Sequence, residues 1–479
     1  MRPLEATLLA VNAICLAPAM FPSMRSASVW RFVALLPAVA AAAQILWEGY
    51  RWQMLPGYAG ALVSVFLLGC SWPILRMLLV GGAFLLAGVC IFTAGYFGPV
   101  FALPALTGSY PVGTATFHLV DENRNEPHAP APQARRELMI QVWYPAQATT
   151  GSEFARYVTP GMAGRRKAQL ALVQTHSVAN APVSTRGGPF PVVMFSPAIG
   201  GTRYQNTFQT EELASHGFVV VGIDHPYTCS NVVFPDGRHI PLSVGYLDFS
   251  TPEKERETKE LVTREMEVRT ADVRFVADTL THWNSSDPRG RFTGRVDTGS
   301  FGIIGHSYGG AVAADICVQD SRFRAGMNLD GWMFGPAETQ GVSRPFFFVI
   351  DDEPIPTAAD LATPDLAQRR LNFRIKLGFD EVDHSLTAHG GYYLSVKGAA
   401  HYSYSDVPLY SLIRRYADEG SVDPQFVLNT LNAYTVAFFN RYLYGRPEPI
   451  LNQPPRQSGI TFRAYQQPQG VMSQVRSLQ

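Results

Sequence analysis

The chain begins with long uncharged stretches, and charged residues become frequent only after about residue 97. Residues 6–24, 52–75 and 77–97 contain no Asp, Glu, Lys or Arg, and residues 32–47 form a shorter uncharged stretch. A helix that crosses a membrane needs about 20 apolar residues, because the hydrocarbon core is about 30 Å thick. The pattern therefore predicts an N-terminal bundle of about four transmembrane helices in residues 1–100, with spans at about 5–22, 30–47, 54–71 and 76–97.

Two other interpretations of this region stay open. The first segment carries Ala17-Pro18-Ala19 near its end, so it could be a cleaved signal peptide, which would leave three spans. Alternatively, the segments are buried helices of a globular domain. Four successive apolar helices with so few charges favour the membrane interpretation.

After residue 98, short apolar runs alternate with helical patterns. Residues 190–196 and 218–224 are almost continuously apolar, which is typical of strands covered by helices on both faces. This alternation predicts an α/β domain with a mostly parallel sheet over residues 105–447. Residues 448–479, rich in Pro and Gln, are expected to form a C-terminal surface tail. Further strands are expected at 114–120, 137–144, 300–305, 325–330, 345–351 and 391–397, and helices at 205–216, 253–283 and 425–443.

The charge count sharpens this division. The 479 residues include 39 Lys and Arg and 39 Asp and Glu, so the zero net charge gives no electrostatic reason to bind nucleic acid. Only seven charged residues lie in residues 1–97. This distribution excludes a simple cytosolic enzyme and predicts a multi-pass integral membrane protein. The five cysteines lack the spacing of zinc or redox sites, so neither a metal nor a cofactor is expected.

Basic residues beside the predicted spans indicate an orientation. Arg25 and Arg31 lie in the first loop and Arg76 lies in the third, whereas Arg2 and Arg51 lie on the side from which the large domain emerges. No Lys or Arg follows Arg76 until the large domain has begun. Because cytoplasmic loops are enriched in Lys and Arg, the large domain is predicted to lie on the extracytoplasmic side.

A Gly-x-Ser-x-Gly motif at residues 305–309 carries the first candidate chemistry. It follows the apolar run 301–304 and precedes a run of small residues at 310–314. A nucleophile elbow requires such a tight turn from strand to helix, with glycines where side chains would collide. We therefore predict that Ser307 is a nucleophile and that the backbone N–H of Tyr308 is one oxyanion donor.

A serine nucleophile of this kind needs a histidine later in the chain. His401 follows the predicted strand 391–397 in a short loop of small residues, and it is the predicted general base. His384 and His389 precede that strand and are five residues apart, which suits no helical metal site. They are therefore expected at the surface.

The pattern leaves the triad acid open. Asp330 ends the strand after the elbow helix, whereas Asp351 and Asp352 end the following strand, which is the commoner position for this acid. The pattern alone slightly favours Asp351. Asp224 ends an earlier strand and precedes the serine, so it is discounted, because the chain order in this fold is serine, acid, histidine.

The second oxyanion donor is expected in the loop after the strand 190–196. Residues 197–201 read Pro-Ala-Ile-Gly-Gly, and such small residues allow backbone N–H groups to face a site. Ile199 is the candidate, and the alternative is a plain turn.

Four stretches together resemble the platelet-activating-factor acetylhydrolase family of α/β-hydrolases, the serine-dependent group VII phospholipases A2. They are FSPAIG at 195–200, LASHGF at 213–218, GHSYGG at 305–310 and LDGWMF at 329–334. The resemblance covers about residues 110–445 and implies an α/β-hydrolase fold. In the family the triad acid is the aspartate of the last stretch, which implies Asp330. The family pattern likewise implies His401 as the histidine, with Tyr308 and Ile199 as oxyanion donors.

The first of these stretches departs from the family, whose usual His-Gly is replaced by Pro197-Ala198. Proline has no N–H, so the family's geometry does not transfer directly to this loop. The N-terminal spans are absent from the secreted animal members, and the chain in this respect resembles a subset of bacterial, membrane-anchored relatives.

These features predict a membrane-anchored serine hydrolase that cleaves carboxylic esters. By the resemblance, its substrates are short-chain or oxidised acyl groups of phospholipids, hydrolysed beside the bilayer. Three alternatives stay open. They are a general carboxylesterase, lipase or polyester hydrolase with the same triad, a dienelactone-hydrolase-like enzyme that would normally use a cysteine in place of Ser307, and an inactive membrane receptor.

Overall fold

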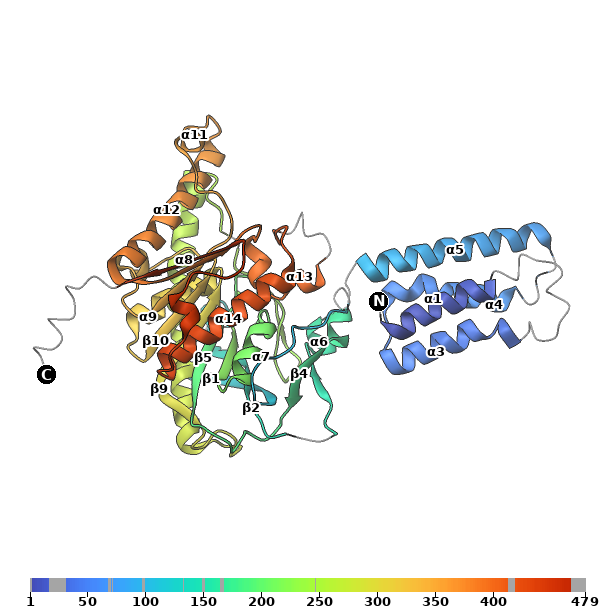
Figure 1. Ribbon diagram of the computed structural model, residues 1–479, viewed down its shortest axis with the longest axis horizontal. Coiled ribbons are helices and arrows are strands. Elements are labelled where there is room, and N and C mark those ends of the chain that lie inside the picture. Colours follow the sequence, from blue (N-terminus) through green and yellow to red (C-terminus); the bar gives the residue numbers. More distant parts are fainter. Residues whose placement is uncertain are drawn as a thin grey trace, which may run out of the picture. The chain divides into compact units, whose positions relative to one another are not determined.

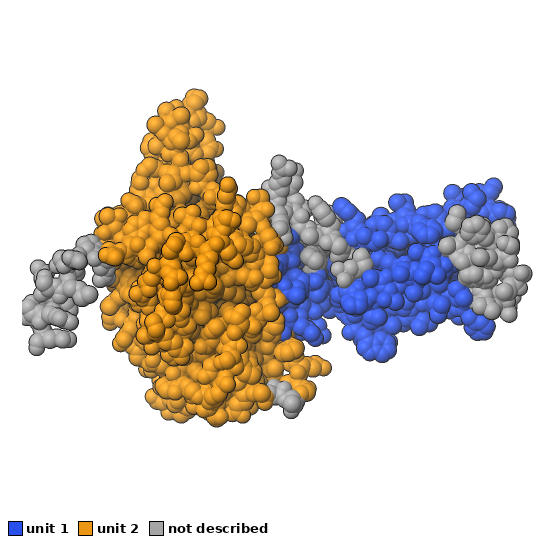
Figure 2. All heavy atoms as spheres, in the orientation of Figure 1, with its two compact units in different colours: residues 1–102, 156–175, 409–413 blue, residues 103–155, 176–408, 414–479 orange. Residues whose placement is uncertain are grey.

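The computed structural model describes residues 2–16, 32–67, 70, 72–96, 100–131, 133–148, 151–163, 168–245, 247–411 and 418–466. The chain divides into two compact units (Figure 2). Unit 1 comprises residues 1–102, 156–175 and 409–413, and unit 2 comprises residues 103–155, 176–408 and 414–479. Unit 1 contains the apolar N-terminal region, and unit 2 contains every candidate catalytic residue.

The N-terminal region of unit 1 is a set of apolar helices that pack side by side (Figure 1). Within the described residues these are α1 (Pro3–Leu16), α3 (Leu36–Glu48), α4 (Leu55–Phe66) and α5 (Pro73–Tyr96). α1 contacts the other three helices, and α4 contacts α3 and α5. Each apolar segment of the sequence thus forms a helix of its own.

Length separates α5 from the other three helices. Within the described part of the chain, only α5 holds a stretch long and apolar enough to cross a membrane, the 21 residues Pro73–Thr93 with a mean hydropathy of 2.3. α1, α3 and α4 have 14, 13 and 12 residues, fewer than the ~20 that a bilayer requires.

The prediction of four transmembrane spans is therefore not supported, and one candidate span remains. The helices are shorter than the predicted spans: α3 begins only at Leu36, with Pro37 in its first turn, and α4 ends at Phe66, whereas the predicted spans cover 30–47 and 54–71. Residues 17–22 and 30–31 of the first two predicted spans lie outside the described residues. The loop with Arg25 and Arg31, on which the predicted orientation rests, lies there too.

Unit 1 buries polar side chains and exposes large apolar ones. Glu5 and Arg51 are almost fully buried and form an ion pair, with 3.1 Å between Arg51 Nη1 and Glu5 Oε1. Contiguous exposed apolar surface is uncommon in monomeric soluble proteins. The exposed apolar side chains include Phe32, Trp47, Leu62, Ile74, Met77 and Leu85.

Unit 2 is organised around a mostly parallel sheet. Its strands are β1 (Val112–Asn125), β2 (Arg135–Pro145), β3 (Phe154–Arg156), β4 (Gln174–Ala179), β5 (Phe190–Ser196), β6 (Val219–Asp224), β9 (Val296–His306), β10 (Phe323–Leu329), β11 (Phe346–Val349), β12 (Gly391–Val396) and β13 (Ile460–Tyr465). Within the described residues the order is β13-β12-β11-β10-β9-β5-β6-β2-β1-β4-β3. All neighbours from β12 to β6 are parallel, whereas β2 is antiparallel to β6 and β1, and β13 is antiparallel to β12.

Helices cover both faces of this sheet (Figure 1). α8 (Pro252–Ser286) and α9 (Tyr308–Gln319) pack on each other and on β9, whereas α7 (Thr207–Ser215) packs with α14 (Pro424–Leu443). In β11, Phe346 and Phe348 join the core cluster that contains Val273 of α8, but Phe347 meets Phe438 of α14 at 5.6 Å between ring centroids. Because successive side chains point to opposite faces, the strand is apolar throughout. This is the predicted α/β-hydrolase architecture.

The elements of unit 2 that the sequence pattern does not predict include α12 (Leu366–His389) and β13. α12 is a 24-residue helix with Leu366, Phe373 and Leu377 exposed, so apolar residues outside the core-facing stripe obscure its period. β13 lies within residues 448–479, so the prediction of a surface tail is wrong for Ile460–Tyr465, which pair with β12. Residues 467–479 of the predicted tail lie outside the described residues.

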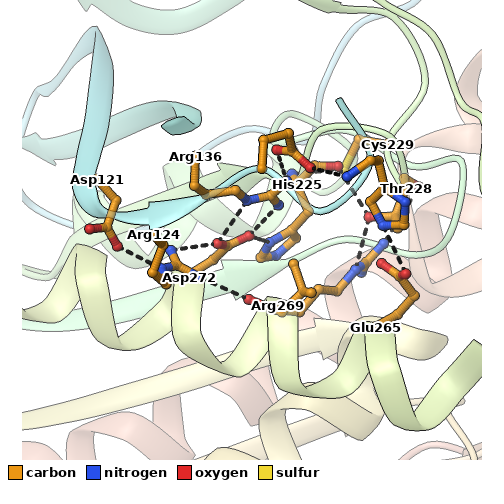
Figure 3. A network of polar contacts seen from close by, with 12 residues as sticks. Asp121, Arg124, Arg136, His225, Thr228, Cys229, Glu265, Arg269 and Asp272 are labelled. Carbon is orange, nitrogen blue, oxygen red and sulfur yellow. Dashed lines mark hydrogen bonds and ion pairs between the residues drawn. The ribbon is translucent and has the colours of Figure 1, made fainter. Parts of the chain in front are cut away.

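A buried network of charged groups ties β1 and β2 to α8 (Figure 3). Asp272, fully buried, accepts from Arg136 Nη2 at 2.6 Å and Nε at 3.1 Å, and from Arg124 Nη2 at 2.8 Å. The Nδ1 of His225 lies 2.8 Å from the same carboxylate. Burial opposes ionisation of Asp272, but Arg136 and His225 outweigh it and hold the pKa of this carboxyl well below its usual range. Asp272 is therefore the negative centre that compensates the buried cations.

Replacing Asp272 by asparagine should destabilise the chain strongly, because the side chain keeps its shape while Arg136 loses a buried partner. Breaking one side of a buried ion pair costs about 3–5 kcal/mol, so we expect a loss of about 3 kcal/mol in the free energy of unfolding. Chemical denaturation of the detergent-solubilised chain, followed by tryptophan fluorescence, measures it. The matched control is Asp278→Asn on the same helix, where an exposed pair with Arg322 should contribute less than about 1 kcal/mol. Equal losses for the two variants would contradict the role given to Asp272.

Candidate active site

The turn between β9 and α9 places Ser307 at the head of the sheet. Ser307 has φ 55° and ψ −125°, a conformation that side-chain-bearing residues rarely adopt. The glycines around it leave room for this turn. A Cβ on Gly305 would lie 1.8 Å from the carbonyl oxygen of Gly309, and a Cβ on Gly309 would lie 2.0 Å from that of Ser196. The motif is therefore a sharp strand-to-helix elbow, as predicted from its sequence.

Asp330 and His401 meet beside this elbow. Asp330 follows β10, and His401 opens the 3-10 turn His401–Tyr404 after β12. The Nδ1 of His401 lies 2.6 Å from Asp330 Oδ2, and the other oxygen of Asp330 accepts the backbone N–H of Asp351 at 2.9 Å. Asp351, which the pattern alone slightly favours, thus donates its backbone N–H to Asp330, and it is Asp330 that lies against His401.

The electrostatics of these groups differ in direction. Burial alone would lower the pKa of His401, but the hydrogen bond and charge of Asp330, with Asp418 and Asp351, outweigh it and raise the pKa above its usual value. Burial and the nearby charge of Asp330 raise the pKa of Asp351 well above its usual range. Two adjacent carboxyl groups do not readily ionise together, which is why the pKa of one of them rises.

A cleft of about 710 Å³ opens at Ser307 and includes Asp330 and His401 in its lining. Among the described residues the Ser307 hydroxyl has no hydrogen-bond partner, and no Ser307–His401 hydrogen bond is present. Catalytic hydrogen bonds of this kind commonly tighten only with substrate in place. The cleft wall is largely apolar, formed by Leu247, Phe249, Trp332, Phe334, Leu371, Ile375, Phe379 and Val382.

The loop after β5 leaves one backbone N–H group without an acceptor. The N–H of Ala198 donates to Gln205 Oε1 at 3.2 Å, that of Gly200 to the carbonyl of Thr228 at 2.8 Å, and that of Gly201 to the carbonyl of Ala198 at 3.0 Å. Pro197 has no N–H. Within the described residues this leaves the N–H of Ile199, which lines the same cleft as Ser307. Tyr308 begins α9, so its N–H also lacks an intrahelical acceptor.

Buried side chains hold this loop from behind. Arg269 of α8, fully buried, donates to the carbonyl of Pro197 at 2.6 Å and to Thr228 Oγ1 at 3.1 Å (Figure 3). Ser196 Oγ lies 3.1 Å from His225 Nε2, and Nδ1 of the same ring lies 2.8 Å from Asp272 Oδ2. This second Ser–His–Asp arrangement is fully buried, so it cannot meet a substrate and instead anchors the start of the loop. Sequence reasoning did not identify these residues, because their spacing carries no motif.

The remaining candidates from the sequence lie away from this chemistry. Asp224 forms a buried ion pair with Arg203. His384 is exposed on α12, and His389 lies 2.7 Å from the carbonyl oxygen of Gln340. Within the described residues no group of three or more His, Cys, Asp or Glu side chains is arranged to hold a metal ion.

Comparison with known proteins identifies the family. Residues 97–447 match the family described as platelet-activating factor acetylhydrolase, isoform II. The chain belongs to this family. The match covers all the candidate catalytic residues and both sides of the cleft. The membrane-anchored type of relative is not distinguished by this match.

Individual platelet-activating factor acetylhydrolases are distant relatives. The chain is 25% identical to that of Cavia porcellus over 289 residues, covering 55% of this chain and 60% of the relative, and 24% identical to that of Gallus gallus over 283 residues, covering 54% and 63%. It thus spans somewhat less than two thirds of the length of these relatives. It is 30% identical over 152 residues to a probable 1-alkyl-2-acetylglycerophosphocholine esterase of Arthroderma benhamiae, covering 32% and 34%.

A solved structure also resembles the chain. It is a ferulic acid esterase from Streptomyces cinnamoneus, with a TM-score of 0.60 and 28% sequence identity over 76% of this chain and 99% of that one. Both this neighbour and the family are named for ester hydrolysis.

Proposed function

We propose that the chain is a serine ester hydrolase in which Ser307, His401 and Asp330 form the catalytic triad. The observation that carries the proposal is the 2.6 Å hydrogen bond between His401 and Asp330 in the cleft that Ser307 lines from a strand-to-helix elbow. Family membership and the names of the relatives support the same reaction class.

In the proposed reaction, His401 Nε2 takes the proton of the Ser307 hydroxyl as the oxygen attacks an ester carbonyl. Asp330 accepts from Nδ1, which fixes the tautomer and stabilises the imidazolium. The backbone N–H groups of Tyr308 and Ile199 hold the oxyanion. His401 then protonates the leaving alcohol, and water hydrolyses the acyl-enzyme by the same steps in reverse. No cofactor is needed for this sequence.

For the substrate, we propose a short-chain or oxidised acyl ester of a phospholipid. The family name and the apolar cleft wall support an acyl ester with a lipid portion. A second candidate is an aryl or general carboxylic ester. The ferulic acid esterase neighbour favours it, because that enzyme is matched over 99% of its length. Initial rates on acetyl, long-acyl and feruloyl esters distinguish the two candidates.

We further propose that unit 1 attaches the enzyme to a membrane, with the catalytic domain on the extracytoplasmic side. The apolar length of α5 and the exposed apolar side chains of unit 1 support the attachment. The positions of the basic residues in the sequence support the orientation.

The full chain should therefore remain in the membrane pellet after an alkaline carbonate wash and be released by detergent, because the exposed apolar surface of unit 1 needs lipid or detergent around it. Immunoblotting of the fractions measures this. Release into the carbonate supernatant would contradict membrane integration.

The Ser307→Ala variant should lose ester hydrolysis by more than about 1,000-fold, because the nucleophile is absent. It should also lose labelling by a fluorophosphonate, which reacts with an activated serine. Hydrolysis of p-nitrophenyl acetate by detergent-solubilised protein measures the rate. Unchanged turnover would contradict the role of Ser307, and an unlabelled, inactive wild type would favour a receptor-type protein.

The two neighbouring aspartates provide a control for the triad. Asp330→Asn should lower kcat by about 100-fold to 10,000-fold, because the histidine loses the partner that sets its tautomer. Asp351→Asn keeps the backbone N–H that Asp330 accepts and removes a carboxyl that is already largely neutral. It should stay within about threefold of wild type. The reverse order would make Asp351 the acid.

The activity should fall as the pH is lowered, because only neutral His401 can accept the serine proton. Since the pKa of His401 is raised above the ordinary value, the inflection in kcat/KM should lie above about 6.5, and rates should reach a plateau at higher pH. His306 and His225, with pKa values lowered to about 3 and about 4, do not titrate in this range. A pH–rate profile with its inflection below about 6 would contradict the assignment.

A further inference from the structure

One buried chain of hydrogen bonds joins the loop that presents Ile199 to the segment that carries His401. The N–H of Ala198 donates to Gln205 Oε1 at 3.2 Å, and the amide nitrogen of Gln205 donates to His306 Nδ1 at 2.7 Å. His306 Nε2 then donates to the backbone carbonyl of His401 at 2.8 Å. Gln205 is 8% exposed and His306 is fully buried. Water therefore offers these groups no alternative partners.

The chemistry of the last acceptor fixes the direction of every bond in this chain. A backbone carbonyl can only accept, so His306 must carry its hydrogen on Nε2 and accept through Nδ1. The amide nitrogen of Gln205 must then face His306, which turns Oε1 toward the N–H of Ala198. Burial and the nearby charge of His401 lower the pKa of His306 to about 3, with Asp330 opposing this effect. The imidazole of His306 thus stays neutral while His401 titrates.

Further hydrogen bonds join the start of α7 to the residues that follow His401. The backbone N–H of Asp406 donates to the carbonyl of Gln205 at 3.0 Å. The carboxylate of Asp406 accepts the N–H groups of Thr207 at 2.8 Å and Phe208 at 3.2 Å, and Asn206 Nδ2 donates to the carbonyl of Tyr404 at 2.8 Å. Gln205 is therefore held by its own backbone to the same segment that its side chain reaches through His306.

We propose that Gln205 and His306 are positioning residues that hold the oxyanion loop and the general base in register around Ser307. This inference rests on the proposed function. In this chain Pro197-Ala198 stands in place of the His-Gly that is usual in the family. Pro197 contributes no N–H, and the N–H of Ala198 is bonded to Gln205. The N–H of Ile199 is therefore the one that remains for a ligand in the cleft. The chain of hydrogen bonds from Ala198 through Gln205 and His306 to His401, which we call the relay, thus determines which backbone N–H the loop presents to the cleft.

The Gln205→Leu variant tests the relay, because leucine has a similar volume and makes no hydrogen bond. We expect kcat to fall about 10-fold to 100-fold, somewhat less than the loss of an entire oxyanion donor. KM should stay within about twofold, because the apolar cleft wall is unchanged. Steady-state kinetics of the full chain in detergent on p-nitrophenyl acetate separate the two constants.

The Gln205→Glu variant gives a readout that a merely structural role would not produce. Its carboxylate can accept from Ala198 but cannot donate to a neutral His306, so the relay re-forms only when His306 is protonated on both nitrogens. The ratio of variant kcat to wild-type kcat should therefore fall as the pH rises. A ratio that stays at one across the pH range would overturn the proposal.

Gln209→Leu is the matched control. Gln209, 1% exposed in the first turn of α7, donates to Thr435 Oγ1 at 2.8 Å and accepts from Asn206 Nδ2 at 3.2 Å, so it makes no bond to Ala198, Gln205 or His306. It should lower the melting temperature by a similar amount and leave kcat unchanged. Wild-type kcat in Gln205→Leu, or an equal loss of kcat in both variants, would overturn the relay. An inactive wild type would instead contradict the proposed function.

Discussion

The strained turn at Ser307 is the constraint on which the candidate site depends. A residue with a side chain at φ 55° is held there at a cost of about 1–3 kcal/mol, and only when its surroundings leave no alternative. Here β5, β9 and β10 supply those surroundings. A Cβ on Gly309 would meet Ser196 of β5, and a Cβ on Gly331 would lie 2.1 Å from the carbonyl oxygen of Ser307. The same close packing brings the loop after β5 and Asp330 to the cleft that Ser307 lines, so the strained turn and the assembly of the candidate site have one origin.

Buried polar side chains also fix the loop after β5 in its position beside Ser307. A buried guanidinium is expensive unless its hydrogens are used, and Arg269 uses them on Pro197 and Thr228. Its partners are mainly neutral oxygen atoms that belong to the loops beside the cleft. Asp272, by contrast, compensates the charge of Arg136 and reaches the loop through His225 and Ser196. The loop that presents Ile199 is therefore fixed by α8 on one side and by Gln205 on the other.

The sequence predicts what depends on local pattern and misses what depends on contacts across the fold. The strands 190–196 and 218–224 are recognisable because burial on both faces makes them almost continuously apolar, and the Gly-x-Ser-x-Gly turn because its glycines are sterically required. α12 is missed because Leu366 and Phe373 are exposed, which spreads apolar residues beyond one face. The four-span prediction counts uncharged residues, but the uncharged stretches extend beyond the helices, so α3 and α4 have only 13 and 12 residues. The pattern alone does not decide between Asp330 and Asp351. The decision depends on the backbone at Asp330, whose φ of 55° accompanies the contact of its side chain with His401.

The two histidines at the site show how one fold sets opposite properties in adjacent rings. The ring centroids of His306 and His401 are 4.8 Å apart. His401 faces a carboxylate that raises its pKa, whereas burial and the nearby charge of His401 lower the pKa of His306 and outweigh its hydrogen bond to the His401 carbonyl. If both rings could charge, their repulsion would oppose the imidazolium that the proposed mechanism forms at His401. A permanently neutral His306 removes that repulsion while still using both of its nitrogens. Neutral hydrogen-bond partners are therefore as necessary next to the proposed base as the charged partner on its other side.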